Sequence, residues 1–237
     1  MAFICVKSVV TPIQFEEARV QREVKVINNL VSLRTAEAQF RLDKGYFTAD
    51  LDSLVDYLKV TPKKEVYKVG SLTEKQLEDG MTENKAAKIL ERARLKAQRK
   101  MKFQGADSLN LLYNYIWEND REVKAEGLQG FRRDTILTNM IQSLYKGQYT
   151  EENIGEIVYI PYTDNVKFEV ETNNEYTTSQ GIKVPIFEIR AHYNTYLHDL
   201  NAQERANIID KEEKLDHYPG LKVGSVDAPN NNAGNWE

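Results

Sequence analysis

The sequence is poor in the residues that build most catalytic and metal sites. It has one cysteine, Cys5, among 237 residues, which excludes an internal disulfide and a zinc site made of several thiolates. Of its three histidines, His192 and His198 could hold a metal ion with Asp199 nearby, but no third ligand is evident, and we expect ordinary solvated or core histidines. Phosphate-binding, dinucleotide-binding, HExxH, GxSxG and CxxC motifs are missing, so we expect no cofactor and no enzymatic activity.

A long hydrophobic run is missing as well. The apolar residues 1–10, MAFICVKSVV, would form a helix of only about 15 Å, half of the hydrocarbon core of a bilayer. Two interpretations stay open. Residues 1–12 are either the start of a helix packed in the core or the end of a membrane anchor, because a charged helix follows them, as it does where single-span anchors leave the membrane.

Charge of one sign is not in excess, since 32 basic and 36 acidic side chains give a net charge of −4. A field that pulls the whole molecule onto nucleic acid or anionic lipid is therefore excluded. The cations are nevertheless concentrated in one predicted helix, around which we expect them to be spread on all sides. They are Lys85, Lys88, Arg92, Arg94, Lys96, Arg99, Lys100 and Lys102.

This basic helix has three interpretations. It is a solvated helix face, or it binds an acidic partner protein or anionic lipid headgroups, or it binds nucleic acid. Aromatic residues are not interleaved with its charges, which disfavours stacking on single-stranded nucleic acid.

Residues 13–60 are predicted to form a stalk helix, to about residue 44, and a short capped helix. Val20, Val24, Ile27 and Val31, and then Leu30, Leu33, Ala36 and Phe40, follow the spacing of three and four residues that is typical of amphipathic helices. The first half has only a thin apolar stripe. We therefore expect it to project as a stalk while the second half packs on a body. Gly45 ends the helix.

The run VINNLVSLRTAEAQFRLDKGYFTADLDSL, residues 26–54, resembles the helix exit of type IV pilins and of the pseudopilins of type II secretion. In that family an amphipathic helix ends in a basic residue, small residues, an aromatic and a Gly-Tyr turn, places held here by Arg34, Phe40, Gly45 and Tyr46. The family's N-terminal processing site is not in the sequence. With its closing segment PGLKVGSVDAPNNNAGNWE, the chain further resembles uncharacterised single-span envelope proteins of Gram-negative bacteria.

The rest of the chain is predicted to contain three parts. Residues 61–130 are a helical insert that carries the basic helix, and residues 131–220 are an antiparallel β domain with a C-terminal helix at 201–216. Pro161 and Pro185 are expected on edge strands or bulges. Residues 221–237 are an Asn-rich tail, in which Trp236 either ties the tail to the body or anchors a partner.

The predicted fold class is α+β, with a pilin-like stalk helix, a helical insert, and an antiparallel sheet with a C-terminal helix. The resemblance implies a non-enzymatic, membrane-tethered envelope protein with a periplasmic body. It would act through protein partners or as a homo-oligomer through its stalk helix. The alternative is a cytoplasmic binding module that uses residues 85–102 on nucleic acid or anionic surfaces.

Overall fold

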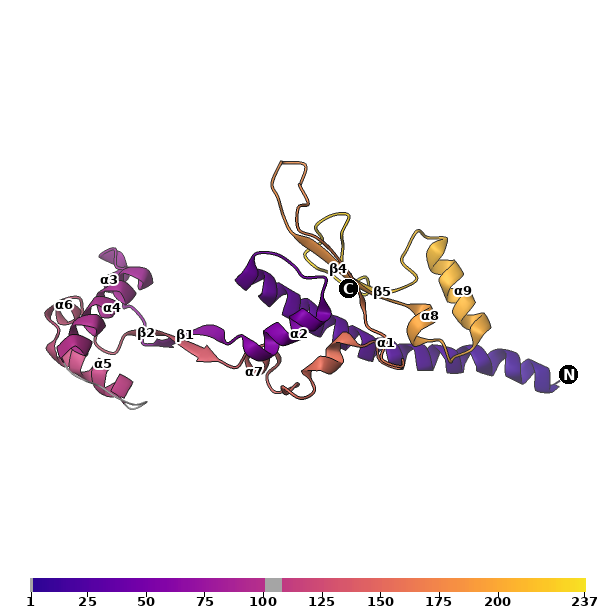
Figure 1. Cartoon of the computed structure of the whole chain (residues 1–237), viewed down its shortest axis with the longest axis horizontal. Coiled ribbons are helices and arrows are strands. Elements are labelled where there is room, and N and C mark those ends of the chain that lie inside the picture. The colour runs from indigo at the N-terminus through magenta and orange to yellow at the C-terminus, as the bar shows by residue number, and fades with distance from the viewer. Residues whose placement is uncertain (1, 101–107) are drawn as a thin grey trace. The chain divides into compact units, whose positions relative to one another are not determined.

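The structure is a computed structural model that describes residues 2–100 and 108–237, with side chains for residues 10–100 and 109–237. The protein is α+β, which confirms the predicted class (Figure 1). The chain forms two compact units: unit 1 comprises Met1–Pro62 and Asn139–Glu237, and unit 2 comprises Lys63–Thr138.

Unit 1 combines one long helix with short helices and a three-stranded sheet. Its helices are α1 (Ala2–Lys44), α2 (Leu51–Val60), α7 (Met140–Tyr145), the 3-10 helix η1 (Ile154–Val158), α8 (Tyr193–Tyr196) and α9 (Ala202–Glu213). Its strands are β3 (Glu169–Asn173), β4 (Ile186–His192) and β5 (Gly220–Gly224).

Helix α1 forms because its apolar residues recur every three or four positions, and it runs through Pro12 rather than beginning after it. Val26, Leu30 and Leu33 are fully buried against β4, β5 and η1. Phe15 is also buried in this core. The expectation that the first half of the helix projects as a free stalk is therefore wrong from Phe15 onward, because one side of that half already packs on the body.

The sheet has the strand order β3-β4-β5 and is antiparallel throughout. Pro185 comes directly before the central strand β4, so the expectation that it marks an edge strand is wrong. Its missing N–H lies outside the ladder, which begins at Ile186. The residues before Pro161 form η1 and one isolated bridge, Tyr159 to Lys167, instead of the expected strand.

The C-terminal residues belong to the sheet rather than to a separate tail. β5 pairs with β4, and the outer edge of β5 is covered by the chain end, where Asn235 N–H donates to the Lys222 carbonyl at 3.0 Å. The expected Asn-rich tail over residues 221–237 is thus replaced by a strand and a docked terminus.

Unit 2 is a two-stranded ribbon that carries four helices. β1 (Lys63–Val69) pairs with β2 (Arg132–Thr138), from Lys63 with Thr138 to Val69 with Arg132. Between them lie α3 (Glu74–Glu78), α4 (Glu83–Lys100), α5 (Ser108–Asn119) and α6 (Arg121–Ala125). The predicted helical insert is present. However, the β domain expected over 131–220 does not include β2, because β2 pairs within unit 2.

Unit 2 has a hydrophobic core of its own. Leu90, Leu112, Ile116 and Leu128 are almost fully buried in it. At its margin the buried Asp134 accepts a hydrogen bond from the Tyr113 hydroxyl at 2.5 Å and pairs with Arg132.

Candidate functional site

Helix α1 presents a second apolar face that nothing in the described chain covers. Ile13, Val20 and Val24 are 53%, 49% and 53% exposed, whereas Val26 and Leu30 are fully buried. At about 100° per residue, the two sets lie on nearly opposite sides of the helix. The exposed face, called the α1 stripe below, consists of Val10, Ile13, Val20 and Val24 and continues into the half-buried Ile27 and Val31.

The stripe has the spacing of a coiled-coil seam. Its members follow one another at alternating steps of three and four residues, with Glu17 in one place of the series. All are valine or isoleucine, whose stiff branched side chains suit knobs-into-holes packing. Together they form a surface that a second helix could cover.

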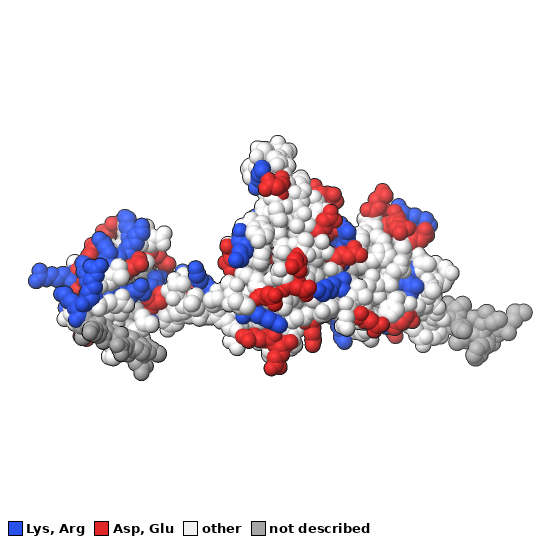
Figure 2. Space-filling model, in the orientation of Figure 1, with Lys and Arg blue, Asp and Glu red and all other residues white. Residues whose placement is uncertain are grey.

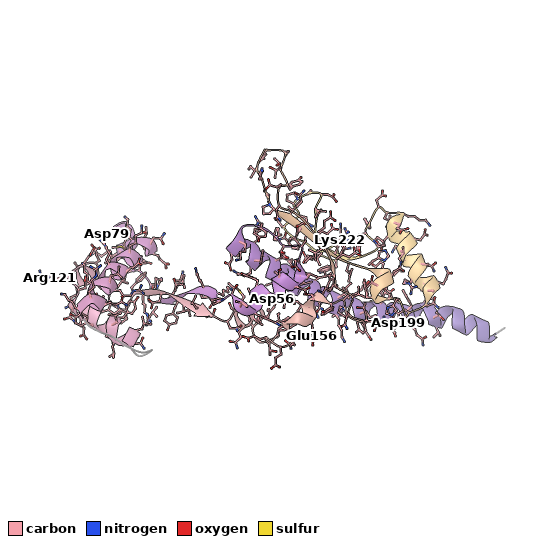
Figure 3. All side chains as sticks on the ribbon, in the orientation of Figure 1. Asp56, Asp79, Arg121, Glu156, Asp199 and Lys222 are labelled. Atoms are coloured by element: carbon pink, nitrogen blue, oxygen red, sulfur yellow. The ribbon has the colours of Figure 1, made fainter. Side chains whose placement is uncertain are left out.

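Arg22 holds the first half of α1 on the body. Its guanidinium donates to the Tyr196 carbonyl at 2.8 Å and to the Asp199 carboxylate at 2.7 Å, and it lies 4.7 Å from the centre of the Tyr162 ring. Figure 3 labels Asp199 beside α1. The hydrogen bond from Arg22 lowers the pKa of Asp199 to about 2. These contacts join the helix segment that carries the exposed stripe to the body of unit 1.

An open, polar cavity lies beside the stripe. Its volume is about 550 Å³, and Lys25, Asn28 and Asn29 of α1 line it together with Tyr159 and Tyr162. Asn29 donates to the Tyr159 carbonyl at 3.1 Å. Amides and hydroxyls of this kind can hydrogen-bond a partner at the rim of an apolar contact.

The four residues that carry the resemblance, Arg34, Phe40, Gly45 and Tyr46, lie in the last turns of α1 and directly after it. Gly45 has φ +88° and donates its N–H to the Arg41 carbonyl, which ends the helix. Phe40 is buried. The rings of Tyr46 and Tyr57 pack edge-on against its ring, with ring centres 5.5 and 5.0 Å away. Arg34 reaches the chain end, where it pairs with Glu237 at 2.6 Å.

Trp236 lies against the body of unit 1. Its ring packs on the core, and the neighbouring Asn235 donates to the Gly220 carbonyl at 2.9 Å. Of its two expected roles, this arrangement favours the tie-down over the partner anchor.

Glu37 is a buried carboxylate that sequence reasoning missed. It is fully buried on α1, and its Oε2 accepts one hydrogen bond, from the Thr48 N–H at 3.2 Å. Its Oε1 has no partner within the described residues. Burial raises the pKa of Glu37 to about 8. Its place on the apolar side of the helix, between Leu33 and Phe40, was the signal available in the sequence.

In unit 2 the cations of α4 lie on one side of the helix, and the expectation that they surround it is wrong. Six of them fall within an arc of about 120°. Arg94 points the other way, toward the buried Asp134 at 3.7 Å. Lys102 lies outside the described residues. The six, called the basic row below, are Lys85, Lys88, Arg92, Lys96, Arg99 and Lys100, and all are exposed. Figure 2 shows the blue side chains gathered over unit 2.

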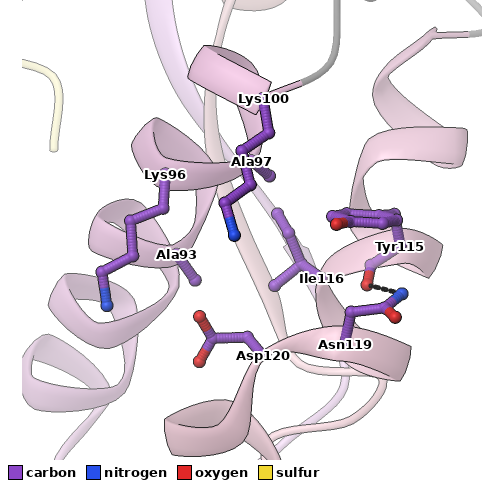
Figure 4. Close-up of a pocket in the computed structure, with 8 residues that line it drawn as sticks. All are labelled: Ala93, Lys96, Ala97, Lys100, Tyr115, Ile116, Asn119 and Asp120. Atoms are coloured by element: carbon purple, nitrogen blue, oxygen red, sulfur yellow. Dashed lines mark hydrogen bonds between the residues drawn. The ribbon is translucent and has the colours of Figure 1, made fainter.

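Two members of the row have partners within their own unit. Arg92 pairs with Glu122 at 2.7 Å, and Lys85 donates to the Gly80 carbonyl at 2.8 Å. Lys96 and Lys100 line a small cavity of about 80 Å³, into which Asp120 also points (Figure 4). That volume is far below the few hundred Å³ of small-molecule sites, so the row acts as a surface rather than as a pocket.

The histidines do not come together. His192 ends β4 and accepts the Asn194 N–H at 3.0 Å, whereas His198 follows α8 and contacts the Thr195 carbonyl. The possibility that both lie on one strand face is therefore wrong. Among the described residues, no three histidine, cysteine or acidic side chains are grouped to hold a metal ion.

None of the helices, as far as the structure describes them, is both long and apolar enough to cross a membrane. Comparisons of the chain with protein-family models, with curated proteins and with solved structures found no match.

Proposed function

We propose that this protein is a non-enzymatic, membrane-tethered component of the cell envelope, pilin-like in its N-terminal part, that works by protein contacts along helix α1. The observation that carries the proposal is the α1 stripe. A helix with two apolar faces, one against its own sheet and one toward solvent, is typical of a subunit that packs on a neighbour.

Two further features support the proposal. Unit 1 has a long helix with an antiparallel sheet packed against it, and residues 26–54 of this unit carry the pilin-like resemblance. The apolar residues 2–10 form the other end of that helix, where a tether would join it. The body would then lie in the periplasm.

Photocrosslinking in cells tests the contact. A benzophenone amino acid is placed at Val20 or Val24 in the stripe and, as a control, at Leu215, which is 55% exposed on unit 1 outside the stripe. We expect a discrete crosslinked band, of a homo-oligomer or of one partner, from the stripe positions only. Equal crosslinking at Leu215, or none at the stripe, would contradict the proposal.

Fractionation tests the tether. The native protein is expected to stay in the membrane pellet after alkaline-carbonate extraction and to be digested by protease added to intact spheroplasts. Full release together with protection from protease would exclude a tethered periplasmic body. It would instead favour the second candidate, a cytoplasmic module that uses the basic row on nucleic acid, which predicts salt-sensitive retention on DNA.

A further inference from the structure

The cations of the basic row repel one another along helix α4, which lowers the stability of unit 2. From Lys85 to Arg99 the members of the row follow one another at three or four residues, the spacing at which like charges on a helix repel one another. The row runs for about 22 Å along α4. Within α4, the acidic Glu91 and the inward-facing Arg94 lie off the arc. The carboxylates near the row, Glu122 and Asp120, come from other elements. A linear set of exposed cations on a rigid helix is better satisfied by an anionic surface than by water alone.

The two units of the chain carry opposite net charge. Lys63–Thr138 contains 16 basic and 12 acidic side chains, whereas the rest of the chain contains 16 basic and 24 acidic ones. Unit 2 is therefore positive by four charges and unit 1 negative by eight. Two copies of the chain attract each other when unit 2 of one meets unit 1 of the other.

Unit 1 offers an acidic surface of suitable composition. α2 packs against η1, and exposed carboxylates lie on α2, on η1 and in the segment directly before η1. Figure 3 labels Asp56 on α2 and Glu156 on η1. The acidic patch comprises four exposed carboxylates, those of Asp56, Glu151, Glu152 and Glu156. Among the described side chains, none of the four is paired with a cation, and Glu151 accepts only the Asn139 amide at 2.8 Å.

We infer that the basic row of one molecule docks on the acidic patch of unit 1 in a second copy of this chain. The contact joins two different surfaces, so each molecule keeps one free row and one free patch and association can continue beyond a dimer. This inference goes beyond the proposed function, because it uses neither the α1 stripe nor the membrane.

Nucleic acid fits the row less well than a second copy does. Four of the six cations are lysines, and residues 83–100 contain no aromatic side chain for stacking on bases. The acidic patch, in contrast, is part of every molecule of this protein and is present at the same concentration as the row.

Sedimentation velocity of the purified full chain tests the inference over a range of concentrations. In about 50 mM salt we expect association that grows with concentration, and in about 500 mM salt a monomer, because salt screens exposed charges. The row variant K88E/K96E/R99E is expected to weaken association at least about tenfold. The control variant K75E/R121E/K124E reverses three exposed cations of unit 2 that lie outside the row. It has the same net charge as the row variant, so it should associate more strongly than the row variant does.

A charge swap makes the test specific. The patch variant D56K/E152K/E156K alone should not associate, but its equimolar mixture with the row variant should, since the intact row of the patch variant meets the intact patch of the row variant and the reversed row meets the reversed patch. Circular dichroism checks that each variant is folded.

Three results would overturn the inference. The first is a monomer at low salt and high concentration. The second is a salt-dependent change in sedimentation that is independent of concentration, which would mean that the row binds within its own molecule. The third is loss of DNA retention, with no loss of self-association, in the row variant. Each leaves the α1 stripe and its crosslinking result untouched, so the two proposals fail separately.

Discussion

At the scale of single residues, Glu37 makes the stability of unit 1 depend on pH. It is a carboxyl that burial leaves with one hydrogen-bond donor and a pKa of about 8. The folded state therefore holds this proton more tightly than the unfolded chain, in which the pKa is about 4.5. The contribution to stability is complete below pH 4.5 and is lost as the pH rises toward 8.

We expect the free energy of unfolding of unit 1 to fall between pH 6.5 and pH 8.5, by about 1.4 kcal/mol per pH unit at the steepest, and the variant E37Q to remove this decline. The amide keeps an acceptor for the Thr48 N–H and carries no charge. His192, whose pKa burial lowers from 6.5, titrates below this window. Urea unfolding at several pH values measures the effect.

The matched control is E17Q, because Glu17 is exposed on the same helix. The control should keep the decline of the unaltered protein. An unchanged pH slope in E37Q would show that Glu37 is ionised in the folded protein.

At the scale of elements, β5 depends on close approach of its backbone to β4. Gly224 has φ +78°, and a Cβ built there would lie 2.2 Å from the Phe187 carbonyl oxygen. G224A is therefore expected to lower the free energy of unfolding by at least about 1 kcal/mol in urea titrations. G155A is the control, since a Cβ at Gly155 meets nothing within 4 Å. Equal stability of the two variants would mean that β5 is not held in this register.

Helices were more predictable than strands because a helix is specified locally. Apolar period and capping signals predicted α2, α4 and α9. In the structure Asp50 caps α2 and Asn201 caps α9. β5 was missed because Gly-Leu-Lys-Val-Gly is too short to show alternation. The partner of β2 was missed because β1 lies beyond four helices in the sequence, and no local pattern encodes that pairing.

The same limit applies to the candidate surfaces. The thin stripe through Val20 and Val24 is visible in the sequence, but which of the two apolar stripes of α1 faces the body depends on groups far along the chain, such as the Tyr196 carbonyl and the Asp199 carboxylate. The basic row could be counted from the sequence. Its restriction to one face follows from helical spacing, and the inward turn of Arg94 depends on the distant Asp134.

At the scale of the whole molecule, two separate cores imply two separate stabilities. The core of unit 1 and the core of unit 2 share no residue among those described. A cavity in one core therefore lowers the stability of that unit, since the free energy of opening can differ between cooperative parts of one chain.

We expect L112A to destabilise unit 2 by about 2–5 kcal/mol, the range for truncating a fully buried leucine. Hydrogen exchange measured peptide by peptide should then speed up across α4, α5 and β2 while the core of unit 1 keeps its protection. F187A, at the fully buried second residue of β4, is the reciprocal control and should speed up exchange in α1 and the sheet only. If either substitution accelerates exchange equally in both units, the two units unfold together as one cooperative body, and the prediction of two separate stabilities is wrong.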